Sequence, residues 1–193
     1  MKKWPEWIIL LLIVATGCGN DSESYTPKPR GYFRIELPPQ EYQRLQIDCP
    51  YSFEYNKYAQ WQKAQRKCWG DVYYPQLKGR LQLTYKPVNP DNMETLLNEG
   101  RQLAFKHTVK ASGIGEKVFT DPDSDVYGIL YNIQGEAATN IQFFMTDSAD
   151  HFLRGVLYFY AEPNVDSLGP VNEYMHSEII HLIETLEWRN SSQ

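Results

Sequence analysis

The sequence predicts an α+β domain: an antiparallel sheet with two main helices packed on it. Three observations support this fold class. Segments with the two-residue alternation of β-strands occur both before and after a helical segment. The last three strand segments are separated by short polar turns, which favours hairpins and therefore antiparallel pairing. A second helical segment ends the chain, so the order is strands, helix, strand meander, helix.

The strand pattern is clearest at residues 80–86, before the first helix. Leu81, Leu83 and Tyr85 share one face there, and polar side chains occupy the other. Shorter strands are predicted at 32–37, 51–55 and 72–74.

The first helix is predicted to start at Asp91, whose side chain can cap it while Glu94 completes a capping box. Its apolar stripe includes Gly100 and His107. Because glycine inside a helix costs about 1 kcal/mol relative to alanine, we expect another backbone to pass close to Gly100. We expect His107 to be a hydrogen-bonded core residue. The stripe also contains Met93, Leu96, Leu97, Leu103 and Ala104.

A meander and a final helix complete the predicted domain, which spans residues 31–190. The strands are expected at 116–119, 126–133, 139–146 and 152–160, with turns at 134–136 and 147–150. The helix is expected at 166–188, with a buried stripe of Leu168, Val171, Met175, Ile179, Leu182 and Leu186.

Residues 1–17 have the organisation of an export signal that ends at a bacterial lipobox. Two lysines precede an apolar run at 8–14, which is shorter than the about 20 residues that a membrane-spanning helix needs. Small residues follow and end at Cys18. We therefore expect removal of the signal and acylation of Cys18, which anchors the protein to a membrane. An uncleaved membrane anchor is the alternative.

Residues 18–30 are polar and contain two prolines, so we expect an acylated N-terminus followed by a flexible tether. At about 3.5 Å per residue, this tether reaches at most roughly 45 Å, which keeps the folded body near the membrane. The chain has a formal charge of −5 and no basic run. This composition argues against binding to nucleic acid and against electrostatic adhesion to anionic lipids.

Two cysteines remain besides Cys18. Outside the cytoplasm, an isolated pair such as Cys49 and Cys68 is most simply a disulfide, and two buried thiols are the alternative. The spacing resembles no zinc site. Trp61 and Trp69 lie in or beside the loop that the disulfide would close.

The densest polar cluster is the segment with Asp147, Ser148, Asp150 and His151. These residue types occur in catalytic triads, but neighbours on a short turn do not easily reach triad geometry, and no Gly-x-Ser-x-Gly motif is present. Turn formation is the favoured interpretation, with an acid–base role as the alternative. No histidine has metal-binding spacing, so we predict no enzyme, no cofactor and no metal site.

Aromatic side chains are abundant in the strand meander. Phe144 lies on the face opposite Phe143, and such residues would form a partner-binding patch if no helix covered them. Ordinary burial on both faces of the sheet is the favoured interpretation, and the partner-binding patch is the alternative.

Seven segments carry a resemblance to a known family. They are 25–32, 49–55, 78–81, 104–108, 126–131, 142–148 and 151–159. Together they resemble the gliding motility lipoprotein GldD family. The members of this family are envelope lipoproteins of Bacteroidota. The resemblance implies a part in gliding motility and in the linked type IX protein secretion, and it supplies no catalytic residue. The element order is similar to the PsbP/Mog1-type α+β fold, which carries no functional implication by itself.

The favoured hypothesis is a non-catalytic, lipid-anchored accessory protein of an envelope machine, with other gliding and secretion proteins as partners. Its expected location is the periplasmic face of the outer membrane. A lipoprotein that binds a small ligand between sheet and helix is the first alternative. An envelope hydrolase acting on glycan or lipid, with Asp147, Asp150 and His151 as acid–base groups, is the second.

Overall fold

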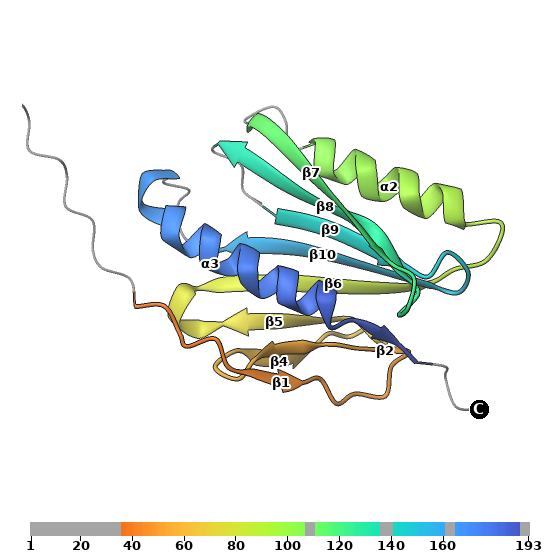
Figure 1. Cartoon of the computed structure of the whole chain (residues 1–193), viewed down its shortest axis with the longest axis horizontal. Coiled ribbons are helices and arrows are strands. Elements are labelled where there is room, and N and C mark those ends of the chain that lie inside the picture. Colours follow the sequence, from red (N-terminus) through yellow and green to blue (C-terminus); the bar gives the residue numbers. More distant parts are fainter. Residues whose placement is uncertain (1–35, 107–110, 136–140, 161–164, 190–193) are drawn as a thin grey trace, which may run out of the picture. The chain divides into compact units, whose positions relative to one another are not determined.

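The computed structural model describes residues 36–106, 111–135, 141–160 and 165–189. Within them, seven strands form one antiparallel sheet (Figure 1). In spatial order these are β4 (Gln60–Lys63), β5 (Gly70–Tyr74), β6 (Gly79–Pro87), β10 (His151–Phe159), β9 (Ile141–Thr146), β8 (Val126–Gly135) and β7 (Ala111–Asp121). A 3₁₀ turn, η2 (Pro75–Leu77), joins β5 to β6.

Four short strands form two small sheets beside the large one. One sheet pairs β1 (Tyr42–Arg44) with β3 (Glu54–Asn56), and the other pairs β2 (Tyr51–Ser52) with β11 (Glu187–Trp188). The described helices are α2 (Met93–Phe105) and α3 (Val165–Glu184). The predicted α+β class is therefore confirmed.

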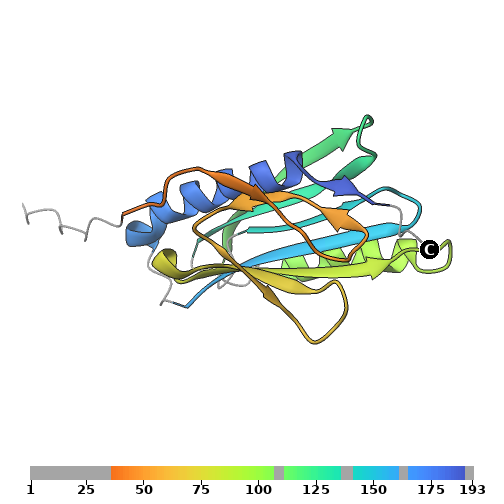
Figure 2. The same ribbon diagram turned by 90° about the horizontal axis from the view of Figure 1, so that it is seen from below.

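The two helices pack on opposite faces of the large sheet (Figures 1 and 2). Neighbouring residues on β10 point to opposite faces, and they belong to different cores. Leu153 lies in the larger core, which contains Met175 and Ile179 of α3. Phe152 lies in the smaller core, which contains Leu96 and Ala104 of α2. The sheet is thus buried on both sides over part of its area.

Strand β6 confirms the clearest prediction. Leu81 and Leu83 are buried in the larger core and Tyr85 packs against it, whereas Gln82 on the other face is exposed. The predicted strands of the meander are confirmed as β7, β8, β9 and β10, although residues 139 and 140 lie outside the described residues.

Helix α2 begins at Met93, and the predicted cap at Asp91 is wrong. The side-chain oxygen of Asn89 accepts hydrogen bonds from the backbone N–H groups of Asp91 and Asn92. The side-chain oxygen of Asn92 in turn accepts one from the backbone N–H of Asn89. These asparagines form a turn that occupies the positions where the cap was expected, and Asn92, the residue before the helix, makes no side-chain cap bond.

The close neighbour of Gly100 is a side chain and not the predicted backbone. A Cβ atom at this position would lie 3.0 Å from Cδ1 of Phe144, so the glycine allows the ring to approach the helix. Phe144 is buried, which confirms the favoured interpretation of ordinary burial for this residue and contradicts the alternative of an exposed aromatic patch. His107 lies outside the described residues.

Several short elements differ from the predictions. The expected strand at 51–55 is split into β2 and β3, which pair with different partners. Residues 36 and 37 are not in a strand, and the rest of the expected strand at 32–37 is not described. Helix α3 ends at Glu184, and Glu187–Trp188 leaves the helix to pair with Tyr51–Ser52. Strands β1 and β4 were not predicted.

The Cys49–Cys68 disulfide is confirmed, with 5.5 Å between the two Cα atoms. It links the segment just before β2 to the turn between β4 and β5. Tyr51 strengthens this junction, because its buried hydroxyl donates to the carbonyl oxygen of Cys68 at 2.9 Å.

Candidate functional site

The predicted polar cluster forms the turn between β9 and β10. One carboxylate oxygen of Asp147 accepts the backbone N–H groups of Ala149 at 3.0 Å, Asp150 at 2.9 Å and His151 at 2.8 Å. Burial alone would raise the pKa of Asp147, but these three donors hold the pKa below its ordinary value. Asp147 is therefore a charged group that stabilises the turn.

His151 is held by aromatic neighbours. Its Nδ1 lies 2.8 Å from the hydroxyl of Tyr85, and its ring stacks on Trp188 with 5.2 Å between the ring centroids. Among the hydrogen bonds of the described residues, none joins Ser148 to His151. The base-to-nucleophile contact that a triad needs is thus missing from this turn.

The turn lines an acidic hollow of about 590 Å³ at one end of the sheet. Three separate segments contribute to it: the turn between β7 and β8, the turn between β9 and β10, and strand β11. The carboxylates on its lining belong to Asp123, Asp125, Asp147, Asp150 and Glu187. Within the described residues, no three histidine, cysteine or acidic side chains are arranged to hold a metal ion.

Neutralising the acid–base candidates of this turn is expected to leave function intact. Asp147→Asn, Asp150→Asn and His151→Phe are close in shape to the residues they replace and keep an aromatic ring against Trp188, but they remove the three acid–base candidates of the turn. We expect cells that carry the triple variant to spread on agar at the wild-type rate. Loss of spreading, with normal amounts of folded protein, would contradict a non-catalytic role for the turn.

A second polar site, which the sequence analysis missed, surrounds the buried carboxylate of Glu178. Glu178 is 3% exposed and lies on the inner face of α3. The hydroxyl of Tyr74 donates to Oε2 at 3.3 Å, and the hydroxyl of Tyr42 donates to Oε1 at 3.2 Å. Gln40 donates a weaker bond to Oε1 at 3.4 Å. These bonds join α3 to β5, to β1 and to the segment that leads into β1.

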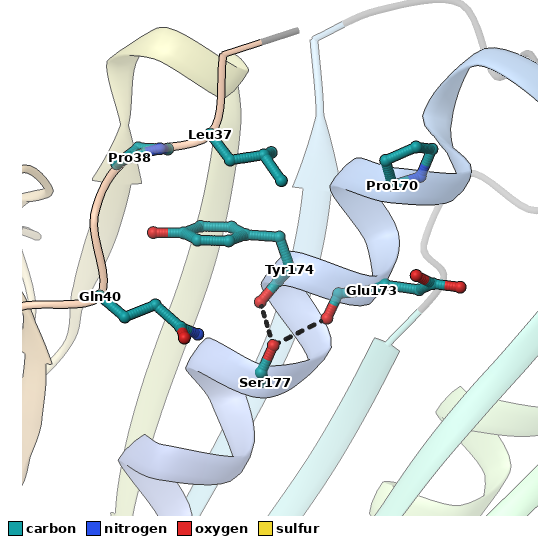
Figure 3. Close-up of a pocket in the computed structure, with 7 residues that line it drawn as sticks. All are labelled: Leu37, Pro38, Gln40, Pro170, Glu173, Tyr174 and Ser177. Atoms are coloured by element: carbon teal, nitrogen blue, oxygen red, sulfur yellow. Dashed lines mark hydrogen bonds between the residues drawn. The ribbon is translucent and has the colours of Figure 1, made fainter.

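A shallow pocket of about 390 Å³ lies beside this network, between the 37–40 segment and α3 (Figure 3). In this view Leu37 lies above the ring of Tyr174, and Pro170 lies to the right on α3. The hydroxyl of Ser177 donates back to carbonyl oxygens of α3, so it is already satisfied. The lining mixes apolar side chains with Gln40, Glu173 and Ser177, and among the described residues no base is paired with a nucleophile there.

Stability is expected to fall as the pH rises from about 10 to 12. Burial is the first cause that raises the pKa of Tyr42 and of Tyr85 from 10.0 to about 12, and nearby carboxylate charges add to it. In the unfolded chain these groups ionise near pH 10, so the folded state binds more protons in this window and the unfolding free energy decreases. Denaturant titrations at several pH values should show a shallower decline for Tyr85→Phe than for Tyr58→Phe, which changes an exposed tyrosine. Equal slopes would contradict the assignment.

Comparison with known families identifies the family. A family model described as gliding motility lipoprotein GldD matches residues 22–188. The chain belongs to this family. The resemblance expected from the seven sequence segments is thus confirmed. No curated protein sequence matches the chain significantly.

Membership of the GldD family makes the chain a lipid-anchored protein of the cell envelope with a role in gliding motility. The family is not a known enzyme family. In the part of the chain that the structure describes, no helix combines the length and the apolar composition needed to cross a membrane. Cys18, the expected site of acylation, lies outside the described residues.

The position of Glu178 in the sequence already indicates that its side chain is buried. It stands three residues after Met175 and four before Leu182, on the same face of the helix as the apolar stripe. A charged residue at such a position must find partners in the core. The sequence could have indicated the burial of Glu178, but its tyrosine partners come from distant strands.

Proposed function

We propose that this GldD-family chain is a non-catalytic accessory lipoprotein that helps to assemble or stabilise the gliding motility machinery and the linked type IX secretion machinery. It works at the periplasmic face of the outer membrane, held there by acyl chains on Cys18. The observation that carries this proposal is the family match over residues 22–188. Its partners are other envelope proteins of the same machinery.

Two features of the chain support a binding role over catalysis. The carboxylate of Asp147 is engaged by three backbone N–H groups, and the nearest candidate base, His151, is packed between a tyrosine and a tryptophan. Two of the three acid–base candidates are therefore engaged in contacts that stabilise the turn. The tether of residues 18–30 keeps the domain within roughly 45 Å of the membrane, where envelope partners are concentrated.

Removing the anchor is expected to abolish function. Cys18→Ser leaves no thiol for acylation, so metabolic labelling with a clickable fatty acid should be lost and colony spreading should stop. The matched control is the double variant Cys49→Ala, Cys68→Ala, which should keep its fatty acid label. Normal spreading of the Cys18→Ser strain would contradict the proposed anchoring.

The accessory role itself is tested by crosslinking in intact cells followed by affinity purification of the full-length protein. We expect recovery of gliding or secretion proteins, and a deletion strain that is defective in both spreading and secretion. If the deletion strain secretes normally but fails to spread, the secretion part of the proposal is wrong. If purification recovers no component of either machinery, the assembly role is wrong.

A further inference from the structure

A small hollow lies beside the disulfide and differs from the other pockets in its charge. Its volume is about 250 Å³. Its apolar walls are Ile47, the Cys49–Cys68 disulfide and the indole rings of Trp61 and Trp69. Lys63, Lys67 and Asp48 complete the lining. Mostly apolar walls with a few charged groups are typical of sites that bind small ligands.

The two indole rings are fixed in place before any ligand arrives. The ring N–H of Trp69 donates to the carbonyl oxygen of Tyr85 at 2.6 Å. The ring of Trp61 lies across Gly70, where a Cβ atom would be only 2.4 Å from the indole. Phe53 contacts the same ring edge-on, with 6.3 Å between the centroids. Binding to such fixed aromatic walls loses little side-chain entropy.

The disulfide wall is also held rigidly. Cys68 has a φ of 60°, a left-handed conformation that residues other than glycine rarely adopt. The disulfide and the hydroxyl of Tyr51, which donates to the carbonyl oxygen of Cys68, hold it there. Backbone conformations of this kind persist only where the surrounding contacts enforce them, and they are frequent at binding sites.

The charge around the hollow is opposite to that of the whole protein. The chain has a formal charge of −5, yet residues 55–70 contain Lys57, Lys63, Arg66 and Lys67 and no acidic residue. Arg66 is occupied over the ring of Trp69, with its guanidinium carbon 4.7 Å from the ring centroid. The side chains that remain to receive a ligand are the two lysines of the lining.

Both lysines of the lining can engage a ligand. Lys67 lies 3.7 Å from the carboxylate of Asp48, but both side chains are largely exposed, and such pairs are weak in water. Among the described residues, the ion pairs do not include Lys63. The lining therefore carries two ammonium groups and one exposed carboxylate, and the excess positive charge favours an anion.

We propose that this hollow binds an anion with the size of a single apolar residue. The anionic group, a carboxylate or a phosphate, lies at Lys63 and Lys67, and the aromatic or branched aliphatic body lies against Trp61 and Trp69. The volume is smaller than the about 300–1,000 Å³ of sites for drug-sized ligands, so one residue-sized group is what fits. A free organic acid and the C-terminal residue of another chain share this chemistry.

Titration of the full-length protein in non-ionic detergent tests the proposal. The probes are N-acetyl-L-phenylalanine and, as a neutral match, N-acetyl-L-phenylalaninamide, with binding followed by tryptophan fluorescence and calorimetry. A ligand of this size in a small preformed site should have a Kd on the order of 1 mM. We expect the amide to bind at least about tenfold more weakly, because it lacks the charge that the lysines recognise.

Lysine variants test whether the ligand binds in this hollow. Lys63→Gln with Lys67→Gln should weaken binding of the acid about tenfold, whereas Lys57→Gln, which removes a charge outside the lining, should not. The proposal is overturned if the acid shows no saturable binding, if the amide binds equally well, or if the control variant weakens binding as much as the double variant.

A short peptide with a free C-terminal phenylalanine distinguishes the two possible sources of the ligand. Tighter binding of the peptide than of the free acid indicates the C-terminus of another chain, and weaker binding indicates a small metabolite. Either result supports the site.

Discussion

Replacing Glu178 by alanine is expected to lower the free energy of unfolding by about 3 kcal/mol, one of the largest effects of any single change in this chain. The substitution removes the acceptor of three hydrogen bonds, from Gln40, Tyr42 and Tyr74. A buried donor left without a partner costs about 1–3 kcal/mol. Tyr74 is buried, while Gln40 and Tyr42 are close enough to water to recover part of the loss. A cavity in the face of α3 adds to the cost.

Two comparison variants distinguish the contribution of this hydrogen-bond network to stability from the effect of any substitution in α3. Glu178→Gln keeps an acceptor of similar shape and should cost only about 1 kcal/mol. Glu173→Ala removes an exposed carboxylate from the same helix and should change stability by less than about 0.5 kcal/mol. Denaturant unfolding provides all three values. If Glu178→Ala and Glu173→Ala have the same stability, the tyrosine network contributes nothing and the assignment is wrong.

The Glu178 network also fastens the first described segment of the chain to α3. The 37–40 segment, which follows the tether in the sequence, continues into β1 and is fastened to α3 by Gln40 and Tyr42. Asn56 adds a further bond, because its side-chain amide donates to the carbonyl oxygen of Pro39 at 2.9 Å. Because these contacts hold the segment to the rest of the described domain, the loss of Glu178 should loosen this segment first.

The elements that the sequence predicted well are those with one face in a core. Strand β6 alternates because Leu81 and Leu83 enter the larger core while Gln82 faces water. The stripe of α3 was predicted for the same reason, and its described members are buried from Val171 to Leu186. Hydrophobic periodicity therefore located six of the seven strands of the large sheet and both helices.

Short strands such as β11 were not predicted because they form by pairing between distant segments of the chain. Glu187 and Trp188 continue a helical pattern in the sequence, yet they form β11 because the edge of β2 offers hydrogen bonds at Tyr51 and Ser52. Strands of two to four residues carry too little periodicity to be predicted. The candidate sites depend on the same distant contacts. The polar cluster at 147–151 was visible as a turn, but the contribution of Trp188 to the acidic hollow was not.

Loss of the disulfide is expected to have an effect of similar size, about 3 kcal/mol for a closed loop of this length in the chain-entropy model. The cysteines are 19 residues apart in sequence, and the loop they close contains β2, β3 and β4. Without the crosslink, the left-handed backbone at Cys68 is held mainly by the hydroxyl of Tyr51. We expect Cys49→Ala with Cys68→Ala to lower the Tm by about 10 °C.

A reducing agent is the matched test for the crosslink. Wild-type protein should lose stability in a reductant and approach the double variant, whereas the double variant should be unaffected by the same treatment. The double variant is preferable to either single change, because a lone cysteine in an oxidising compartment can pair with other chains. Equal melting temperatures of wild type with and without reductant, after confirmed reduction, would show that the bond does not stabilise the fold. Stability would then come from the packing of Tyr51, Phe53 and Trp61 around the loop, and Phe53→Ala would become the most damaging change in this region.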